Sequence, residues 1–145
     1  MDIVKLDPLA LSDAIHHRVI SCVEVMRAYL DRIEACAGAN AIVSLRPEDD
    51  LLAEATDADR ALAAGRSAGW MHGMPQAVKD LAACRGLSFT QGSPIDSETI
   101  AEEDASFVAP IRWCVVIGRA NLGPRKRRMG SCRTITKTTA RSSTR

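Results

Sequence analysis

The spacing of apolar residues changes near Trp70, and this change restricts the chain to a mixed α/β fold. Before Trp70 the apolar residues recur every three or four positions, which is the period of an amphipathic helix. After it they occur in short runs that glycine and proline interrupt, as is typical of strands and turns. We therefore expect N-terminal helices followed by part of a mixed β-sheet that helices flank.

Three helices are predicted in the first part of the chain. The first begins at Asp7-Pro8, a capping acid before a proline at the first helical position, and extends to about Arg18. The second begins at the capping box Ser21-Cys22-Val23-Glu24, carries one apolar stripe and ends at Gly38-Ala39-Asn40. The third is rich in alanine and stops near Gly65.

Strands are predicted where short apolar or β-branched runs lie between turn residues. One precedes Pro47 and three follow Trp70. A further helix, capped by Asp104, is expected between the last two runs, although Pro110 would cost it about 3 kcal/mol unless that proline falls in the first turn or at a kink. The predicted strands are 41–45, 76–78, 88–90 and 114–117.

Composition indicates a soluble globular chain of about one domain. The 145 residues are 46% hydrophobic and 26% charged, and the 3% of aromatic residues leave little for stacking nucleobases. No apolar stretch approaches the roughly 20 residues that a membrane helix needs, and the first residues lack the apolar region of a signal peptide. We expect no membrane association and a cytoplasmic location.

The cysteines suggest neither a disulfide framework nor a metal site. Five are present, which is an odd number, and none forms a Cys-x-x-Cys pair. Small buried thiols in a reducing compartment account for such a distribution. We assign no chemistry to Cys22, Cys36, Cys84, Cys114 and Cys132.

Charge divides the chain into two parts. All eighteen acidic residues lie at or before Asp104, whereas eight of the nineteen basic residues lie in 124–145. Residues 1–123 therefore contain eleven basic and eighteen acidic residues, which is a net charge of −7, whereas the whole chain carries +1. An acidic body is thus followed by a basic tail.

Lys79 is the residue to which we attach chemistry, because it follows a short apolar run at the end of a predicted strand. A lysine must be neutral to act as a base, yet its reference pKa near 10.4 leaves only about one molecule in 2,500 unprotonated at pH 7. Burial in a dry site would have to lower that pKa by about three units. Such a site requires a large, well-packed surround.

Two other polar residues near Lys79 are expected to be structural. His72 has no second His, Cys or acid at metal-ligand spacing, so a single hydrogen bond in a turn is its expected role. Ser93 lies in the turn Gly92-Ser93-Pro94 without a partner base, so we do not expect it to be a nucleophile.

Three segments, taken together, resemble the amidase signature family in order, spacing and residue type. The predicted helices before them also look like the N-terminal helices of that family, so the likeness spans about Leu6 to Asn121. The first segment is the most specific of the three. The segments are His72-Gly73-Met74-Pro75-Gln76-Ala77-Val78-Lys79-Asp80-Leu81, Gln91-Gly92-Ser93-Pro94 and Val116-Ile117-Gly118-Arg119-Ala120-Asn121.

The resemblance implies amide C–N hydrolysis in a mixed α/β sheet, on a small-molecule amide and with no metal or organic cofactor. Members use a nucleophilic serine, a second serine on a cis peptide bond and a lysine base, and Lys79 matches that lysine. The serines belong to a Gly/Ser-rich loop further along the family's sequence. Because Ser131, Ser142 and Ser143 do not lie in such a loop, Lys79 is the one catalytic residue that we carry over.

The likeness stops at Gly123-Pro124, where the basic tail begins. A permissible codon choice for 137–145, read in a shifted frame, encodes Asp-Tyr-Gly-Thr-Lys-Leu-Asn-Ala, which resembles the family's own continuation. We therefore expect 1–121 to be the N-terminal part of an amidase-like domain. Residues 122–145 would be a basic, disordered, non-native tail that follows a frameshift, and the chain would be inactive alone.

Three other functions remain open at this point. The tail could bind nucleic acid or anionic lipid through phosphates, but the acidic body and the lack of a recognition element argue against a specific nucleic-acid partner. The chain could instead belong to the A subunit of a transfer RNA-dependent amidotransferase, which shares the signature. It could also be a non-catalytic remnant whose unpaired sheet edge invites association. The sequence leaves the substrate and the oligomeric state open.

Overall fold

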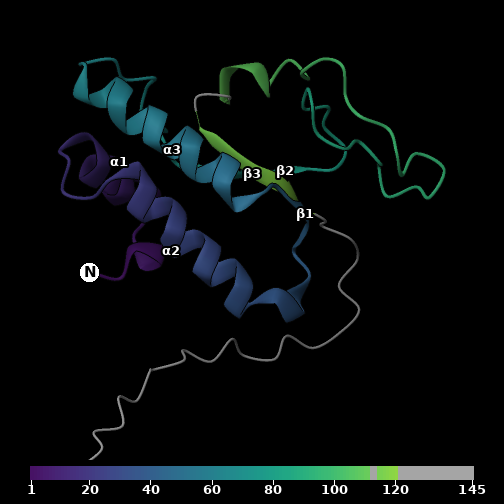
Figure 1. Ribbon diagram of the computed structural model, residues 1–145, viewed down its shortest axis with the longest axis horizontal. Coiled ribbons are helices and arrows are strands. Elements are labelled where there is room, and N and C mark those ends of the chain that lie inside the picture. The colour runs from purple at the N-terminus through teal and green to yellow at the C-terminus, as the bar shows by residue number, and fades with distance from the viewer. Residues whose placement is uncertain (112–113, 121–145) are drawn as a thin grey trace, which may run out of the picture.

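The computed structural model of the protein describes residues 1–111 and 114–120, and it has the mixed α/β fold that the sequence predicts. Figure 1 shows α2 and α3 side by side against a small sheet. The strands lie in the order β1-β3-β2. The helices are α1 (Pro8–His16), α2 (Cys22–Ala35) and α3 (Glu48–Ala63), and the strands are β1 (Ile42–Leu45), β2 (Pro75–Lys79) and β3 (Val115–Ala120).

Helix α1 begins where the sequence predicts it. The Asp7 carboxylate accepts hydrogen bonds from the N–H groups of Leu9 and Ala10, both at 3.0 Å, and Pro8 occupies the first helical position. The helix ends two residues earlier than predicted, at His16. Arg18 has a φ of 56° and therefore cannot continue a right-handed helix.

Helix α2 is capped from two sides. Within the capping box, the Ser21 hydroxyl accepts from the Glu24 N–H at 3.1 Å and the Glu24 carboxylate accepts from the Ser21 N–H at 2.8 Å. The bonds from Ser21 hold the pKa of Glu24 below its usual range. From α3, the Asp59 carboxylate accepts from Cys22 N–H at 2.8 Å and from Val23 N–H at 3.3 Å. This second cap binds α2 to α3.

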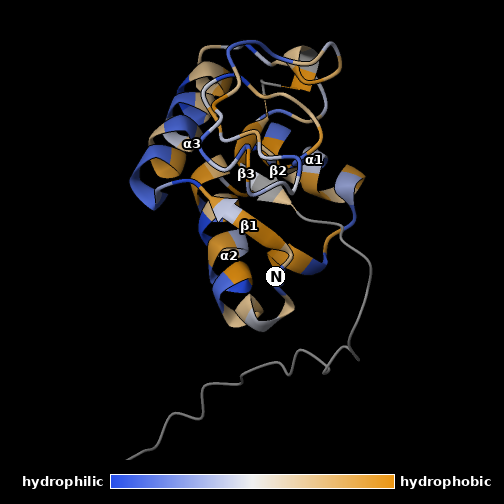
Figure 2. Ribbon diagram, turned by 90° about the vertical axis from the view of Figure 1, so that its right-hand side faces the viewer, coloured by the Kyte–Doolittle hydropathy of each residue, from blue (hydrophilic) through white to orange (hydrophobic). Residues whose placement is uncertain are grey.

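Strand β3 is the centre of the sheet and has a core on each face. It pairs antiparallel with β1 and parallel with β2. Because side chains alternate along a strand, Val115 and Ile117 pack with the helices, whereas Val116 packs in a second cluster. That second cluster also holds Val78 and the segment after β2, including Cys84 and Val108. Figure 2 shows the three strands together with α2 and α3.

The β1–β3 pair contains a close backbone approach. Gly118 has a φ of +152°, and a Cβ atom at this position would lie 2.1 Å from the Ser44 carbonyl oxygen. The register shifts between Ile42 and Ser44 at the same place. A residue without a side chain thus allows β1 to lie against β3 here.

The predicted strand 88–90 is not formed. This segment makes an isolated antiparallel bridge between Ser88 and Ile100, and the Phe89 N–H donates to the Thr99 carbonyl at 2.7 Å. Gln91 and Gly92, with φ of 52° and 74°, turn the chain directly after this segment. The pairing is therefore too short to form a strand. The prediction was wrong about the element, although the backbone is locally paired.

The predicted helix after Asp104 is reduced to one 3-10 turn, Ala109–Ile111. The Asp104 carboxylate accepts from the Arg85 N–H at 2.8 Å, so it joins two loops instead of capping a helix. Pro110 lacks the N–H that a helix interior would use. Phe107, which a helix would have turned toward the core, is 60% exposed.

Several sequence predictions concern residues 122–145, which lie outside the described residues, as does Cys132. In the part that is described, Cys22, Cys84 and Cys114 are free and buried, as expected of small apolar thiols. The expectation was wrong for Cys36, which is half-buried and disulfide-bonded. None of the described helices is long and apolar enough to span a bilayer.

Candidate functional site

The candidate site lies at the carboxyl end of β2, where the predicted lysine is found. The turn before this strand is closed by the Met74 N–H, which donates to the Met71 carbonyl at 3.1 Å. Met74 then begins the parallel ladder, because its carbonyl accepts from the Val115 N–H at 3.1 Å. At the other end, Lys79 pairs with Ala120 of β3. The hydrogen bonds of the sheet therefore fix the backbone position of Lys79.

His72 anchors the start of this segment and is structural, as predicted, but its ring makes two hydrogen bonds where one was expected. It is 4% exposed. Its Nδ1 accepts from the Ala68 N–H at 3.1 Å and its Nε2 donates to the Ala58 carbonyl of α3 at 2.9 Å. Because a backbone N–H can only donate and a carbonyl can only accept, the ring is the neutral Nε2–H tautomer. Both ring nitrogens are thus used for holding the loop on α3.

Gly73 brings the same turn against the start of α2. Its φ is +68°, and a Cβ atom here would lie 2.2 Å from the Cys22 sulfur. That thiol is fully buried. Burial, followed by the neighbouring Asp59 carboxylate, raises the pKa of Cys22 to about 12. Cys22 therefore fills space as a neutral thiol, in agreement with the absence of any assigned chemistry.

Lys79 is exposed, and no described residue pairs with its ammonium group. The dry surround that a neutral lysine would need is therefore not provided by residues 1–111 and 114–120. These residues do hold the backbone of Lys79 in a fixed position at the end of two parallel strands. In α/β proteins, groups that act on ligands commonly lie at such carboxyl ends.

The next residue, Asp80, joins the strand end to the following loop. Its N–H donates to the Ala120 carbonyl at 3.2 Å, which extends the ladder beyond Lys79. Its carboxylate accepts from the Thr90 N–H at 3.1 Å and from the Thr90 hydroxyl. Sequence reasoning missed this contact, because ten residues separate the partners and no local pattern marks the pair.

Ser93 is a turn residue, as predicted. Its hydroxyl accepts from the Ile95 N–H at 3.2 Å and its own N–H donates to the Thr90 carbonyl at 2.8 Å. Within the described residues no group of three or more His, Cys, Asp or Glu side chains is arranged to hold a metal ion.

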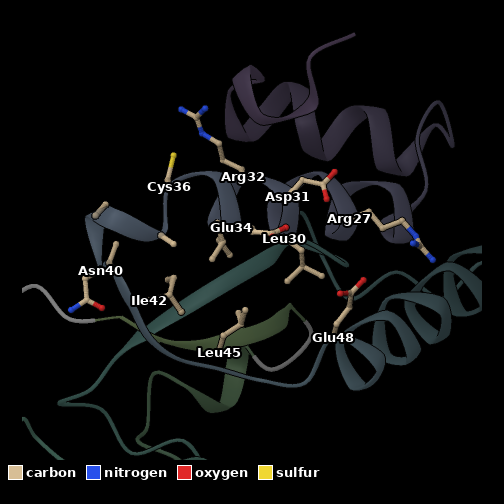
Figure 3. Close-up of a pocket in the computed structure, with 14 residues that line it drawn as sticks. Arg27, Leu30, Asp31, Arg32, Glu34, Cys36, Asn40, Ile42, Leu45 and Glu48 are labelled. Carbon is tan, nitrogen blue, oxygen red and sulfur yellow. The ribbon is translucent and has the colours of Figure 1, made fainter. Parts of the chain in front are cut away.

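A large hollow on the described surface lies away from this site. A cavity of about 880 Å³ lies between the end of α2 and β1, and Lys79 is not among its lining residues. Figure 3 shows Leu30, Ile42 and Leu45 in it, with charged groups of both signs at its margin. We place the candidate site at Lys79 because the strand end holds a potential base in a fixed position, whereas the cavity is a mixed apolar and charged surface.

The parallel pair β2–β3, in a sheet with helices on one face, places the chain in the α/β class, in which ligands commonly bind beyond the carboxyl ends of the strands. Comparison with known proteins narrows this class: the family model described as Amidase matches residues 24–124, and the chain belongs to this family of amide-hydrolase type. This match confirms the resemblance inferred from the sequence.

Individual relatives agree with the family. The chain is 38% identical over 124 residues to the A subunit of the glutamyl-tRNA(Gln) amidotransferase of Geobacter sulfurreducens, covering 83% of this chain and 25% of that protein. It superposes on the peptide amidase of Stenotrophomonas maltophilia with a TM-score of 0.73 and 28% identity, covering 81% and 25% of the two chains. A fatty acid amide hydrolase, at 22% identity and a TM-score of 0.75 over 81% and 21%, shares the fold. The chain spans about a quarter of the length of these relatives.

Proposed function

We propose that this chain carries the lysine of an amidase, and that Lys79 is the base in hydrolysis of the C–N bond of a small-molecule amide. The observation that carries the proposal is the place of Lys79, at the carboxyl end of β2 and inside the region that matches the family. In this role a neutral Lys79 would take a proton from a bridging serine, which in turn activates the nucleophilic serine. We assign no metal or organic cofactor to the reaction.

The test uses a hybrid enzyme in which residues 1–120 replace the matching part of the peptide amidase of Stenotrophomonas maltophilia. Turnover would be followed as ammonia released from a peptide amide. We expect Lys79→Ala to lower kcat at least about 100-fold, the usual contribution of a positioned base. Lys79→Arg should be equally inactive because a guanidinium does not deprotonate in proteins.

Lys5→Ala is the matched control, since Lys5 is exposed and pairs only with the nearby Asp2 at 2.8 Å in the described structure. It should leave turnover within about twofold, as is usual for surface ion pairs. A folded hybrid that hydrolyses amide equally well with alanine at position 79 would contradict the proposal. We expect the 145-residue chain itself to show no turnover, and activity that Lys79→Ala abolishes would show that expectation to be wrong.

Residues 122–145 we interpret as an out-of-frame, non-native tail after an amidase-like region at 1–121. Two facts support this interpretation: the family match ends at residue 124, and acidic residues are absent after Asp104. Sequencing the coding DNA tests whether residues 122–145 follow a frameshift. We expect another reading frame downstream of codon 122 to encode an amidase-like segment, and its absence would exclude a frameshift.

A second candidate is the A subunit of a transfer RNA-dependent amidotransferase, which the 38% identity to the Geobacter sulfurreducens protein favours. Either enzyme would act on an amide through the same lysine, and we propose no membrane partner and no specific nucleic-acid contact. We propose a cytoplasmic location on the basis of the three buried free thiols, Cys22, Cys84 and Cys114, whereas the disulfide at Cys36 does not support it.

A further inference from the structure

We propose that Ser67 is an acylation site, because the imidazole ring of His16 is placed to remove the proton of the Ser67 hydroxyl group. The site lies where the end of α1 meets the loop between α3 and β2. It does not involve Lys79 and goes beyond the function proposed above. We infer that its substrates are activated acyl esters, such as aryl esters, and that the product is an acyl ester of Ser67.

His16 has the tautomer that a general base requires. Its Nδ1 lies 2.8 Å from the Ser12 carbonyl oxygen, which can only accept, so Nδ1 carries the proton of the neutral ring. Its Nε2 therefore presents a lone pair, and the Ser67 Oγ lies 2.9 Å from it. The hydroxyl donates to Nε2, since the alternative acceptor, the Gly69 carbonyl, is 3.4 Å away. A hydroxyl bonded to a base that a third group orients is the pattern of an activated nucleophile.

Both groups are held in place before any reaction. The Ser12 hydroxyl donates to the Trp70 carbonyl and so joins α1 to the loop that carries Ser67. The His16 ring is half-buried and lies edge-to-face with the His72 ring, with 6.2 Å between centroids and 60° between planes. Ser67 itself is exposed, so an acyl donor in solution can reach its hydroxyl. A fixed base beside an accessible nucleophile needs little rearrangement to react.

The backbone N–H groups around Ser67 determine which acyl donors can react. The Gly69 N–H donates to the Ser67 Oγ at 3.2 Å and stabilises negative charge on this oxygen as its proton leaves. The Ala68 N–H donates to the His72 Nδ1 at 3.1 Å. Neither group is therefore free to bind the oxyanion of a tetrahedral intermediate, an interaction on which amide cleavage depends. Esters with good leaving groups should acylate Ser67, whereas amides should not.

The reaction transfers one acyl group from the ester to the protein. The Ser67 Oγ attacks the carbonyl carbon of an aryl ester while its proton moves to the His16 Nε2. A bond forms between Oγ and the carbonyl carbon, the bond from that carbon to the aryl oxygen breaks, and the departing aryl oxide takes the proton from His16. The products are a phenol and acylated Ser67.

The experiment treats the 145-residue chain with p-nitrophenyl acetate. Absorbance follows the release of p-nitrophenolate, and mass spectrometry of tryptic peptides locates the acetyl group. We expect a stoichiometric burst of p-nitrophenolate and an acetyl group on Ser67. Ser67→Ala should remove both the burst and the acetylated peptide.

His16→Gln should slow the acetylation of Ser67 about 100-fold, because a positioned base contributes at least this factor and a side-chain amide cannot take up the proton. His17→Gln is the matched control. The His17 Nδ1 also lies 2.8 Å from a backbone carbonyl, that of Asp13, but no hydroxyl among the described residues bonds to its Nε2. This variant should be acetylated at the wild-type rate.

Two results would overturn the proposal: an unchanged rate of Ser67 acetylation in His16→Gln, and acetylation of other residues without acetylation of Ser67. Circular dichroism would establish that the variants are folded. A further measurement uses the wild type alone. The amide p-nitroacetanilide should leave Ser67 unmodified, and acetylation of Ser67 by this amide would contradict the inferred class of substrate.

Discussion

Gly118→Ala should remove much of the protein's stability, lowering the free energy of unfolding by roughly 3–5 kcal/mol. The new methyl group would lie 2.1 Å from the Ser44 carbonyl oxygen and 3.0 Å from the Leu45 Cα atom. Both are backbone atoms, so β1 would have to move away from β3. The φ of +152° adds strain, because residues with a side chain rarely adopt it. Urea denaturation followed by far-UV circular dichroism measures the loss.

Gly38→Ala is the control for this substitution, because no atom lies within 4 Å of the Cβ that it would add. It should change the free energy of unfolding by less than about 1 kcal/mol in either direction. Equal midpoints for Gly118→Ala and the wild type would show that β1 does not depend on the close approach to β3.

The second large effect is expected at the turn before β2. Gly73→Ala would place a methyl group 2.2 Å from the buried Cys22 sulfur, at a φ of +68°. We expect a loss of roughly 2–4 kcal/mol, of which about 1–2 kcal/mol is the left-handed backbone and the remainder the collision. Thermal and urea unfolding of the purified variants would both report it.

Two variants separate these contributions. Gly65→Ala has almost the same φ, +72°, but meets nothing within 4 Å, so it measures the backbone cost alone. Cys22→Ala combined with Gly73→Ala should recover the part due to the collision. If Gly65→Ala proved as damaging as Gly73→Ala, the contact between this turn and α2 would not be the cause.

The helices were predictable from the sequence because their signals are local. Asp7 and the Ser21 to Glu24 box act within four residues, and each forms the bonds that its type predicts. The 41–45 and 76–78 strands were also found, since Pro47 and Gly73 delimit them. A helix or strand can be predicted from the sequence when the residues that begin and end it lie within or next to it.

The prediction failed where a distant partner decides the structure. Asp104 is a good capping residue by type, but the Arg85 N–H, nineteen positions earlier, uses its carboxylate. Asp59 reads as an ordinary polar residue of α3, yet it caps α2 from across the interface. The same limitation applies to the site: Lys79 could be named from its sequence block, whereas the contact between Asp80 and Thr90 exists only once the loop has folded back.

The position of β3 in the sheet has a consequence for the order of folding. It is the last strand of the described chain, yet both β1 and β2 form their ladders with it. During synthesis, α2 and α3 can associate as soon as residue 63 is available, but the two outer strands must wait for 115–120. Closing loops of this length is slow compared with forming local helical contacts. A nascent chain would therefore carry β1 and β2 without their partner strand until β3 has left the ribosome.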